Sequence, residues 1–297
     1  MQTKLAETAG FCFGVDRAVA LVEQAVREGK RVATLGPIIH NRHVIERFKT
    51  LGVREIAAPA EAAAGECVVI RSHGVSRAVM EALEKMGVEI VDATCPFVKK
   101  IHRIISAAAE NGQQPVIIGT RAHPEVQAIA GWCSAPLVFE SPEEFASWLA
   151  DDAKRTEIPI RMVCQTTSTQ NLWKKTCEIA KKECTNCEIF DTICKATEMR
   201  QEEAAYLSKS CDAMVVVGDA RSSNTGRLAM ICNENCPKVI LVDHADELDM
   251  SFFHDAATVG ITAGASTPPW IIKEVNNKMS EELKVETAQE ENFAELL

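Results

Sequence analysis

The stretch "EIVDATCPFVKKIH" (residues 89–102) places a single cysteine between a strand and a helix. Its apolar start is typical of a short strand, and the run after Pro96 has the apolar periodicity of a helix. Pro96 suits the first helical position, because its missing N–H would have no partner within the helix. A helix N-terminus also offers free amides and partial positive charge, which stabilise a thiolate. The stretch therefore predicts that Cys95 is a metal ligand or a nucleophile.

Two other cysteines have the same surroundings. Cys12 in "TAGFCFGVDRAVALVEQAV" and Cys194 in "DTICKATEMRQEEAAYLSK" also stand directly before apolar-periodic runs. In all three copies a strand-like run ends in a glycine that lies 24 residues after the cysteine, at Gly36, Gly119 and Gly218. A polar side chain follows four residues later, at His40, His123 and Ser222. Three equal offsets indicate three copies of one α/β unit.

Helices that alternate with short apolar strands favour parallel sheets with crossover helices. We therefore expect an α/β fold of three pseudo-threefold-related units, with short and mainly parallel sheets, arranged around a common centre. The predicted divisions are an N-terminal segment with the first cysteine (1–13), three α/β units (14–95, 96–193 and 194–280) and an acidic C-terminal tail (281–297).

The composition narrows the class of protein. The 297 residues are 46% apolar, yet they contain no uninterrupted apolar run long enough for a membrane span. The N-terminus lacks the pattern of a secretory signal, so we expect a cytoplasmic protein. A net charge of −10 disfavours non-specific nucleic-acid binding. Twelve cysteines in a reducing compartment predict buried thiols and soft-metal ligands rather than disulfides.

Each unit has a second strand-like run that ends in polar residues: "CVVIRSHG" (67–74), "RMVCQTTS" (161–168) and "TVGITAGAS" (258–266). Ligands of open α/β sheets bind beyond the carboxyl ends of the strands, so these loops and those after the glycines predict one site. Hydrogen-bond donors at helix N-termini are typical of phosphate binding, although turn and N-cap roles would also suit any single one. The candidate substrate-binding residues are His40, His73, His123, Thr166, Thr167, Ser222, Ser223, Asn224 and Ser266.

Three cysteines so far apart in the sequence do not resemble a structural zinc site, whose ligands come in close pairs. They suit a [4Fe–4S] cluster with one iron that has no protein ligand. Glu125, in "AHPEVQ", is the carboxylate among the candidate loops and is a candidate proton carrier. A first-turn glutamate favoured by the helix dipole is the alternative interpretation of Glu125.

Nine motifs together resemble the 4-hydroxy-3-methylbut-2-enyl diphosphate reductase family. In chain order they are "GFCFGVDRAV", "GPIIHN", "RSHGVS", "DATCPFV", "AHPEVQ", "QTTS", "DTICKATEMRQ", "SSNT" and "GITAGAST". The resemblance implies a three-lobed α/β fold around a central iron–sulfur cluster. It implies reductive dehydroxylation of (E)-4-hydroxy-3-methylbut-2-enyl diphosphate to isopentenyl and dimethylallyl diphosphates at the open iron of one [4Fe–4S] cluster, the last step of the non-mevalonate isoprenoid pathway.

The same resemblance implies roles for individual residues. Cys12, Cys95 and Cys194 look like the three cluster ligands. Glu125 resembles the proton source, Thr166 resembles the threonine that orients the substrate hydroxyl, and His123 resembles a substrate-binding histidine that helps to deliver protons. The set that resembles the family's diphosphate-binding residues is His40, His73, Ser222, Ser223, Asn224 and Ser266. The implied partners are an electron donor such as ferredoxin or flavodoxin and the allylic diphosphate, and the implied assembly is a monomer or homodimer.

The chain departs from the family pattern at a few positions that are not candidate ligands. Asp219, Ala220 and Arg221 stand where small residues or glycine are expected, and Asp219 adds an acid beside the expected anion site. Ala128 replaces a usual glycine, and Ser168 replaces a common leucine. These departures bear on the shape of the pocket and the rate of the reaction, not on the class of substrate.

Three alternatives remain open from the residues alone. Cys177, Cys184, Cys187 and Cys194 form a C-x6-C-x2-C-x6-C pattern that is compatible with a separate metal site, although it contains only one C-x-x-C and Cys194 already belongs to the repeat. The open iron would also suit a non-redox hydratase, which would need no external reductant. The third alternative is an iron–sulfur sensor protein. The net charge of −10 disfavours a nucleic acid as the partner of such a sensor.

Overall fold

The computed structural model describes residues 1–280, and the predicted acidic tail (281–297) lies outside them. The chain forms two compact bodies. Of the described residues, the smaller body comprises Met1–Cys12, His40–Arg42 and residues 196–280, and the larger body comprises Phe13–Ile39 and His43–Lys195. Within residues 1–280, no helix combines the length and the apolarity needed to cross a membrane.

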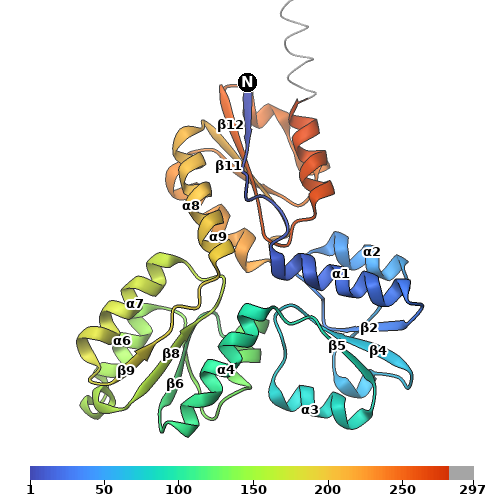
Figure 1. Ribbon diagram of the computed structural model, residues 1–297. Helices are drawn as coiled ribbons and strands as arrows, with labels where there is room; N and C mark the ends of the chain where they lie inside the picture. The colour runs from blue at the N-terminus through green and yellow to red at the C-terminus, as the bar shows by residue number, and fades with distance from the viewer. Residues whose placement is uncertain (281–297) are drawn as a thin grey trace, which may run out of the picture. The chain divides into compact units, whose positions relative to one another are not determined.

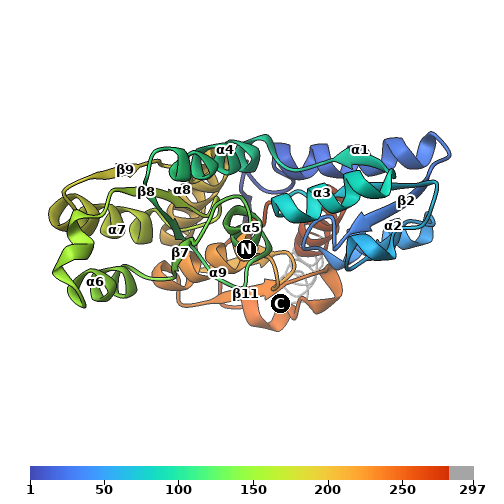
Figure 2. The same cartoon turned by 90° about the horizontal axis from the view of Figure 1, so that it is seen from below.

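The first sheet of the larger body has four parallel strands in the order β3-β2-β4-β5. These strands are β2 (Arg31–Leu35), β3 (Arg54–Ile56), β4 (Glu66–Ile70) and β5 (Glu89–Asp92). Helices α1 (Phe13–Arg27) and α2 (Arg42–Thr50) lie on one face, and α3 (Arg77–Met86) lies on the other (Figures 1 and 2). Side chains alternate between the faces of a strand, so Leu35 and Ile70 pack with Leu83 of α3 in one apolar layer.

The second sheet of the larger body repeats this plan with the parallel order β7-β6-β8-β9. Its strands are β6 (Gln114–Ile118), β7 (Leu137–Phe139), β8 (Ile160–Cys164) and β9 (Cys187–Ile189). Helices α4 (Pro96–Glu110) and α5 (Pro124–Ala130) cover Ile117 and Val163 on one face. Helices α6 (Pro142–Ala150) and α7 (Gln170–Glu183) cover Ile118 and Met162 on the other.

The sheet of the smaller body is also parallel, in the order β1-β12-β10-β11. Its strands are β1 (Gln2–Leu5), β10 (Ala213–Val217), β11 (Val239–Val242) and β12 (Thr258–Ala263). Helices α8 (Lys195–Ser210) and α9 (Ser223–Asn235) pack on Met214 and Val216, and the helical residues 269–280 pack on Val215 and Val217.

The described residues of the two bodies also contain four short 3-10 helices in their loops: η1 (Pro59–Glu61), η2 (Ala153–Glu157), η3 (Ala245–Glu247) and η4 (Met250–Phe253).

The three sheets share one strand order. Numbered by appearance, the strands of both sheets in the larger body run second, first, third, fourth. In the smaller body β11, β10 and β12 follow the same order, and β1 takes the fourth place beside β12. The N-terminal strand therefore completes a sheet whose other strands come from residues 213–263. In every case the fourth strand is the one that leads to a candidate cysteine.

The predicted α/β fold with short parallel sheets is confirmed. The three strand-like runs that end in glycine are β2, β6 and β10, and the helices after the cysteines are α1, α4 and α8. Gly119 and Gly218 are needed for space, because a Cβ would lie 2.7 Å from the Gln165 Cβ and 2.5 Å from the Thr267 Oγ1, respectively. The predicted boundaries of the three units stay a prediction.

Candidate active site

The three candidate cysteines make the same backbone contact. The Cys95 N–H donates to the Ser72 carbonyl (2.9 Å), the Cys194 N–H to the Thr166 carbonyl (3.0 Å), and the Cys12 N–H to the Ala265 carbonyl (3.1 Å). Each acceptor lies two residues after the third strand of its own sheet, which ends at Ile70, Cys164 or Ala263. The fold thus places each of the three candidate cysteines in the same position at the carboxyl end of a sheet.

All three sulfurs are partly exposed rather than buried in a core. Cys95 is the N-cap of α4, with Pro96 at the first helical position, as the sequence predicts. A thiolate at this place lies beside the free amides of the first turn, which stabilise its charge. Three such thiolates are the donor set of a cluster with one iron that lacks a protein ligand, so the residues present fit an iron–sulfur group.

Gly14 leaves room for the Cys95 sulfur. A Cβ on Gly14 would lie 2.7 Å from the Cys95 Sγ, closer than real Cβ contacts. The second glycine of "GFCFG" is therefore required by close approach of the α1 backbone to a candidate ligand, not by phosphate binding.

Two arginines that sequence reasoning missed hold the cysteine loops. The Arg17 guanidinium donates to the carbonyls of Asp92 (3.2 Å) and Thr94 (3.3 Å), just before Cys95. The Arg200 guanidinium donates to the Gly10 carbonyl (2.7 Å), just before Cys12. They lie five and six residues after a candidate cysteine, in "FGVDR" and "KATEMR", and these unequal offsets are not part of the repeat.

Glu125 and Thr166 form a buried pair in the larger body. The Thr166 backbone N–H donates to Glu125 Oε1 and its hydroxyl donates to Oε2, both at 2.6 Å. Glu125 is 2% exposed, and this burial raises the pKa of its carboxyl, against the lowering effect of the two hydrogen bonds. A raised pKa keeps a proton on Glu125 at higher pH than on an ordinary glutamate, which suits a proton donor.

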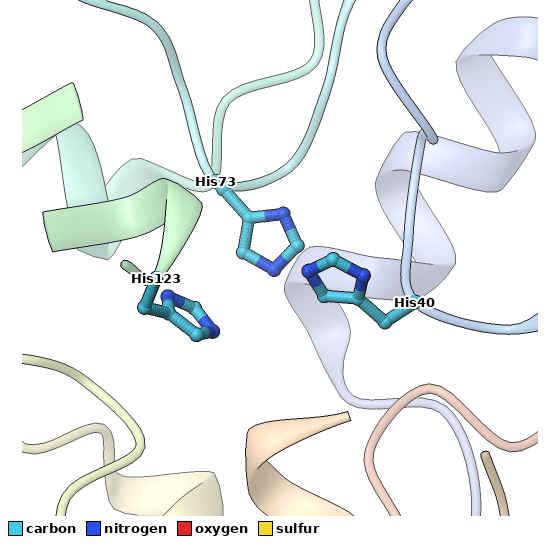
Figure 3. A group of neighbouring side chains, drawn as sticks. All are labelled: His40, His73 and His123. Carbon is cyan, nitrogen blue, oxygen red and sulfur yellow. The ribbon is translucent and has the colours of Figure 1, made fainter. Parts of the chain in front are cut away.

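His123 lies directly before this pair, at the N-cap of α5. Its Nδ1 accepts the Glu125 backbone N–H at 3.2 Å, so a neutral imidazole carries its proton on Nε2 and presents a donor there. The His73 and His123 rings lie edge to face with their centroids 5.4 Å apart (Figure 3). The Thr167 hydroxyl accepts a hydrogen bond from the side-chain amide of Gln165 at 2.8 Å.

The candidate residues of the smaller body form a second group. Ser222 is the N-cap of α9, and the Ser266 hydroxyl lies 3.2 Å from the Ser222 hydroxyl and 3.1 Å from the His40 carbonyl. The Asn224 Oδ1 accepts the Ala265 N–H at 2.9 Å. Its buried Nδ2 finds no hydrogen-bond partner among residues 1–280, so this donor is available to a ligand.

Ser223 occupies the first position of α9, so this group lies at the N-terminus of the helix. Free amides and the helix dipole make such an end an anion-binding site. The structure therefore brings His40, Ser222, Asn224 and Ser266 together, as expected for diphosphate binding.

Asp219, one of the departures from the family pattern, belongs to the framework of this group. Its buried carboxylate accepts the backbone N–H of Arg221 (2.9 Å) and the Arg221 guanidinium (2.6 Å), and it lies 3.3 Å from the Arg42 N. The Arg221 hydrogen bonds hold the pKa of Asp219 below its usual value. The carboxylate is thus neutralised, and it ties the loop after His40 to the loop before Ser222.

The pattern Cys177, Cys184 and Cys187 does not favour a metal site. Burial raises the pKa of Cys177 to about 11 and that of Cys187 to about 12, so both thiols keep their protons at neutral pH. All three pack against the apolar core of the β6–β9 sheet. Cys67, Cys164, Cys211, Cys232 and Cys236 are buried, and Cys133 is partly exposed.

The chain is similar to known reductases over nearly its whole length. The model of the LytB protein family matches residues 3–280. The 4-hydroxy-3-methylbut-2-enyl diphosphate reductase of Caldanaerobacter subterraneus subsp. tengcongensis is 40% identical over 283 residues, which are 94% of this chain and 96% of that protein. The corresponding reductase of Geobacter sulfurreducens is 38% identical over 281 residues, 95% of this chain and 98% of that protein.

Solved structures agree with this similarity. A structure of (E)-4-hydroxy-3-methyl-but-2-enyl diphosphate reductase, described as the terminal enzyme of the non-mevalonate pathway, is 37% identical and has a TM-score of 0.70. The matched region covers 95% of this chain and 100% of the chain in that structure. A reductase from Plasmodium falciparum shares the fold, with a TM-score of 0.83 at 24% identity and coverage of 93% and 87%.

Gly14→Ala is expected to weaken iron retention, although alanine in a helix normally stabilises by about 1 kcal/mol. The added methyl group would displace the Cys95 sulfur, and disturbed ligand orientation typically lowers metal affinity by about 10- to 100-fold. Iron per chain after dialysis against a chelator measures this. Gly226→Ala in α9 is the control, because its Cβ meets no atom within 4 Å. Equal iron retention in both variants would contradict the close approach.

Asp219→Asn is expected to lower the free energy of unfolding by about 1 kcal/mol at pH 7, because the donors of Arg221 and Arg42 lose an ionised acceptor. The folded-state pKa of Asp219 is lowered, so its contribution is present above the usual aspartate pKa and is lost as the pH falls. Urea unfolding of the apoprotein at pH 7 and at about pH 3 should show the difference shrinking. The exposed Asp246→Asn control should change stability by less than about 0.5 kcal/mol at either pH.

Proposed function

The chain belongs to the LytB family of 4-hydroxy-3-methylbut-2-enyl diphosphate reductases, and we propose that its own residues bind the allylic diphosphate and remove its hydroxyl group as follows. It is an oxidoreductase of the non-mevalonate isoprenoid pathway, acting at the terminal step, and its family is an iron–sulfur family. This relation argues against the hydratase and sensor alternatives. The proposed products are isopentenyl and dimethylallyl diphosphates.

One observation carries the proposal for the cofactor. The backbone amides of Cys12, Cys95 and Cys194 bond to equivalent carbonyls, so the fold treats the three thiols alike. We propose that these thiolates hold one [4Fe–4S] cluster. When bound, the cluster would supply electrons one at a time and a Lewis-acidic iron.

The diphosphate needs donors that compensate its charge. The first turn of α9 offers free amides, with the Ser222 hydroxyl and the Asn224 amide beside them. Ser223, Ser266, His40 and His73 supply further donors in the proposed set. Asp219 does not oppose anion binding, because Arg221 neutralises its charge.

Glu125 is the proposed source of the proton for the leaving oxygen. Its raised pKa favours the protonated form, Thr166 fixes the orientation of its carboxyl, and the Thr166 hydroxyl would also orient the substrate hydroxyl. His123 and Thr167 complete the proposed contacts with the substrate. The balance of the reaction is two electrons and two protons consumed: the C–O bond breaks, one proton leaves with the oxygen as water, and one is added to carbon.

The remaining proposals concern the setting of the enzyme. A one-electron carrier such as ferredoxin or flavodoxin would deliver the electrons, and the assembly would be a monomer or homodimer. Twelve free thiols suit a reducing compartment, which supports a cytoplasmic location.

Cys95→Ser tests the cofactor and the activity together. Anaerobically purified parent protein should contain about four irons and four sulfides per chain, the content of one cubane cluster, and the variant should lose most of both. The parent should convert the diphosphate only when a reductant is present. Cys184→Ser should keep its iron, because Cys184 packs against an apolar core. Zinc in place of iron, or iron that survives Cys95→Ser but not Cys184→Ser, would overturn the assignment.

Glu125→Gln should lower the rate by about 10²- to 10⁴-fold, the usual worth of a positioned acid, with little change in iron content or substrate binding. In the parent, the rate should fall as the pH rises through the raised pKa of Glu125, since only its protonated form donates. Single-turnover rates from pH 6 to about pH 9 measure both effects. The exposed Glu143→Gln on α6 is the control. A variant with the parental rate would exclude Glu125 as the proton source.

A further inference from the structure

The start of α1 and the start of α4 lie together in the larger body, where Gly14 approaches the Cys95 sulfur. We propose that the exposed side chains around this contact, Phe13, Phe97, Lys100 and Arg103, form the surface on which an acidic one-electron carrier protein docks. We call this the α1/α4 surface. The inference rests on the proposed function, because it concerns how electrons reach the cluster that Cys95 would help to hold.

Two aromatic side chains in the α1/α4 surface are exposed, and packing of the core does not require them. Phe13 is 65% exposed and Phe97 is 49% exposed, while the rest of each helix follows an ordinary buried stripe. Phe13 directly precedes Gly14, and Phe97 is two residues after Cys95. Exposed aromatic surface beside a functional group is typical of the centre of a protein interface, which is enriched in such residues. A docked protein would therefore cover the position closest to this thiolate.

The charge of α4 identifies the kind of partner. From Pro96 to Ala109 the helix contains no acidic residue. Lys99 is neutralised by Asp92 at 2.6 Å, but Lys100 and Arg103 are exposed and form no ion pair within residues 1–280. In the first turns of α1, the charges of Asp16 and Arg17 cancel. The α1/α4 surface is therefore locally cationic.

This local charge contrasts with the whole chain, whose net charge is −10. An acidic carrier is repelled by the chain as a whole and attracted at the α1/α4 surface. Such a pattern orients an encounter and accelerates it, more than it adds to final affinity. Fast, short-lived docking is what a protein needs if it must receive two single electrons in succession from separate carriers.

The test compares two electron sources for the same enzyme. Reduced methyl viologen is a small molecule that needs no protein surface, and a reduced acidic ferredoxin is the protein probe. The double variant Lys100→Glu/Arg103→Glu should keep its iron and its turnover with methyl viologen, but lose about tenfold or more in kcat/KM for ferredoxin. For the parent, that kcat/KM should fall as NaCl rises from about 0.05 M to about 0.3 M, and the variant should lose this dependence.

Phe97→Ala tests the aromatic part, and should raise the KM for ferredoxin several-fold without changing its salt dependence. The control is Lys174→Glu/Lys182→Glu, the same charge change at exposed positions of α7. It should leave both electron sources unaffected.

Three results would overturn the α1/α4 surface as the docking site. The first is an equal kcat/KM for ferredoxin in the parent and the Lys100→Glu/Arg103→Glu variant. The second is an equal loss of kcat/KM in the α7 control. The third is a parent that turns over with methyl viologen but accepts no electrons from the acidic ferredoxin. Failure of the parent with methyl viologen would instead overturn the proposed function.

Discussion

One repeated hydrogen bond sets the geometry on which the chemistry depends. In each sheet, the carbonyl two residues beyond the third strand accepts the backbone N–H of a cysteine that follows a fourth strand. The bond involves no side chain, so it leaves the sulfur available and fixes only where the cysteine lies. Because backbone bonds depend on strand order, the shared order of the three sheets is what makes three distant thiols equivalent.

The candidate proton donor is held by one of the same loops. Thr166 serves twice: its carbonyl holds Cys194, while its N–H and hydroxyl hold the buried carboxyl of Glu125. The loop after β8 therefore links the position of a candidate cluster ligand to the protonation of the candidate acid. A change in this loop would disturb both at once. An apolar replacement of Thr166 would remove the hydroxyl donor from the buried Glu125 Oε2, while Oε1 would keep the backbone N–H.

The sequence was informative where the signal was periodic. Cys12, Cys95 and Cys194, with the glycines that end β2, β6 and β10, were predictable because equal offsets in the chain reflect one repeated supersecondary unit. The role of Gly14 in leaving room for a sulfur was not predictable. It depends on a contact between positions 14 and 95, which lie 81 residues apart in the chain. Arg17, Arg200 and the neutralised Asp219 were missed or misjudged for a similar reason: single side chains that brace loops leave no pattern in a sequence. Nor did any residue reveal that β1 belongs to the sheet formed by residues 213–263.

The place of β1 also has a consequence for the order in which the protein is made. A ribosome delivers Cys12 early, but the strand before it pairs only with β12, which ends at Ala263. Synthesis runs from the N-terminus, and closure of so long a segment is slow relative to local folding. Cys12 thus receives its backbone partner, the Ala265 carbonyl, only when almost the whole chain has been translated. A prematurely terminated chain can therefore hold at most the two later candidate thiols, Cys95 and Cys194, in these backbone positions.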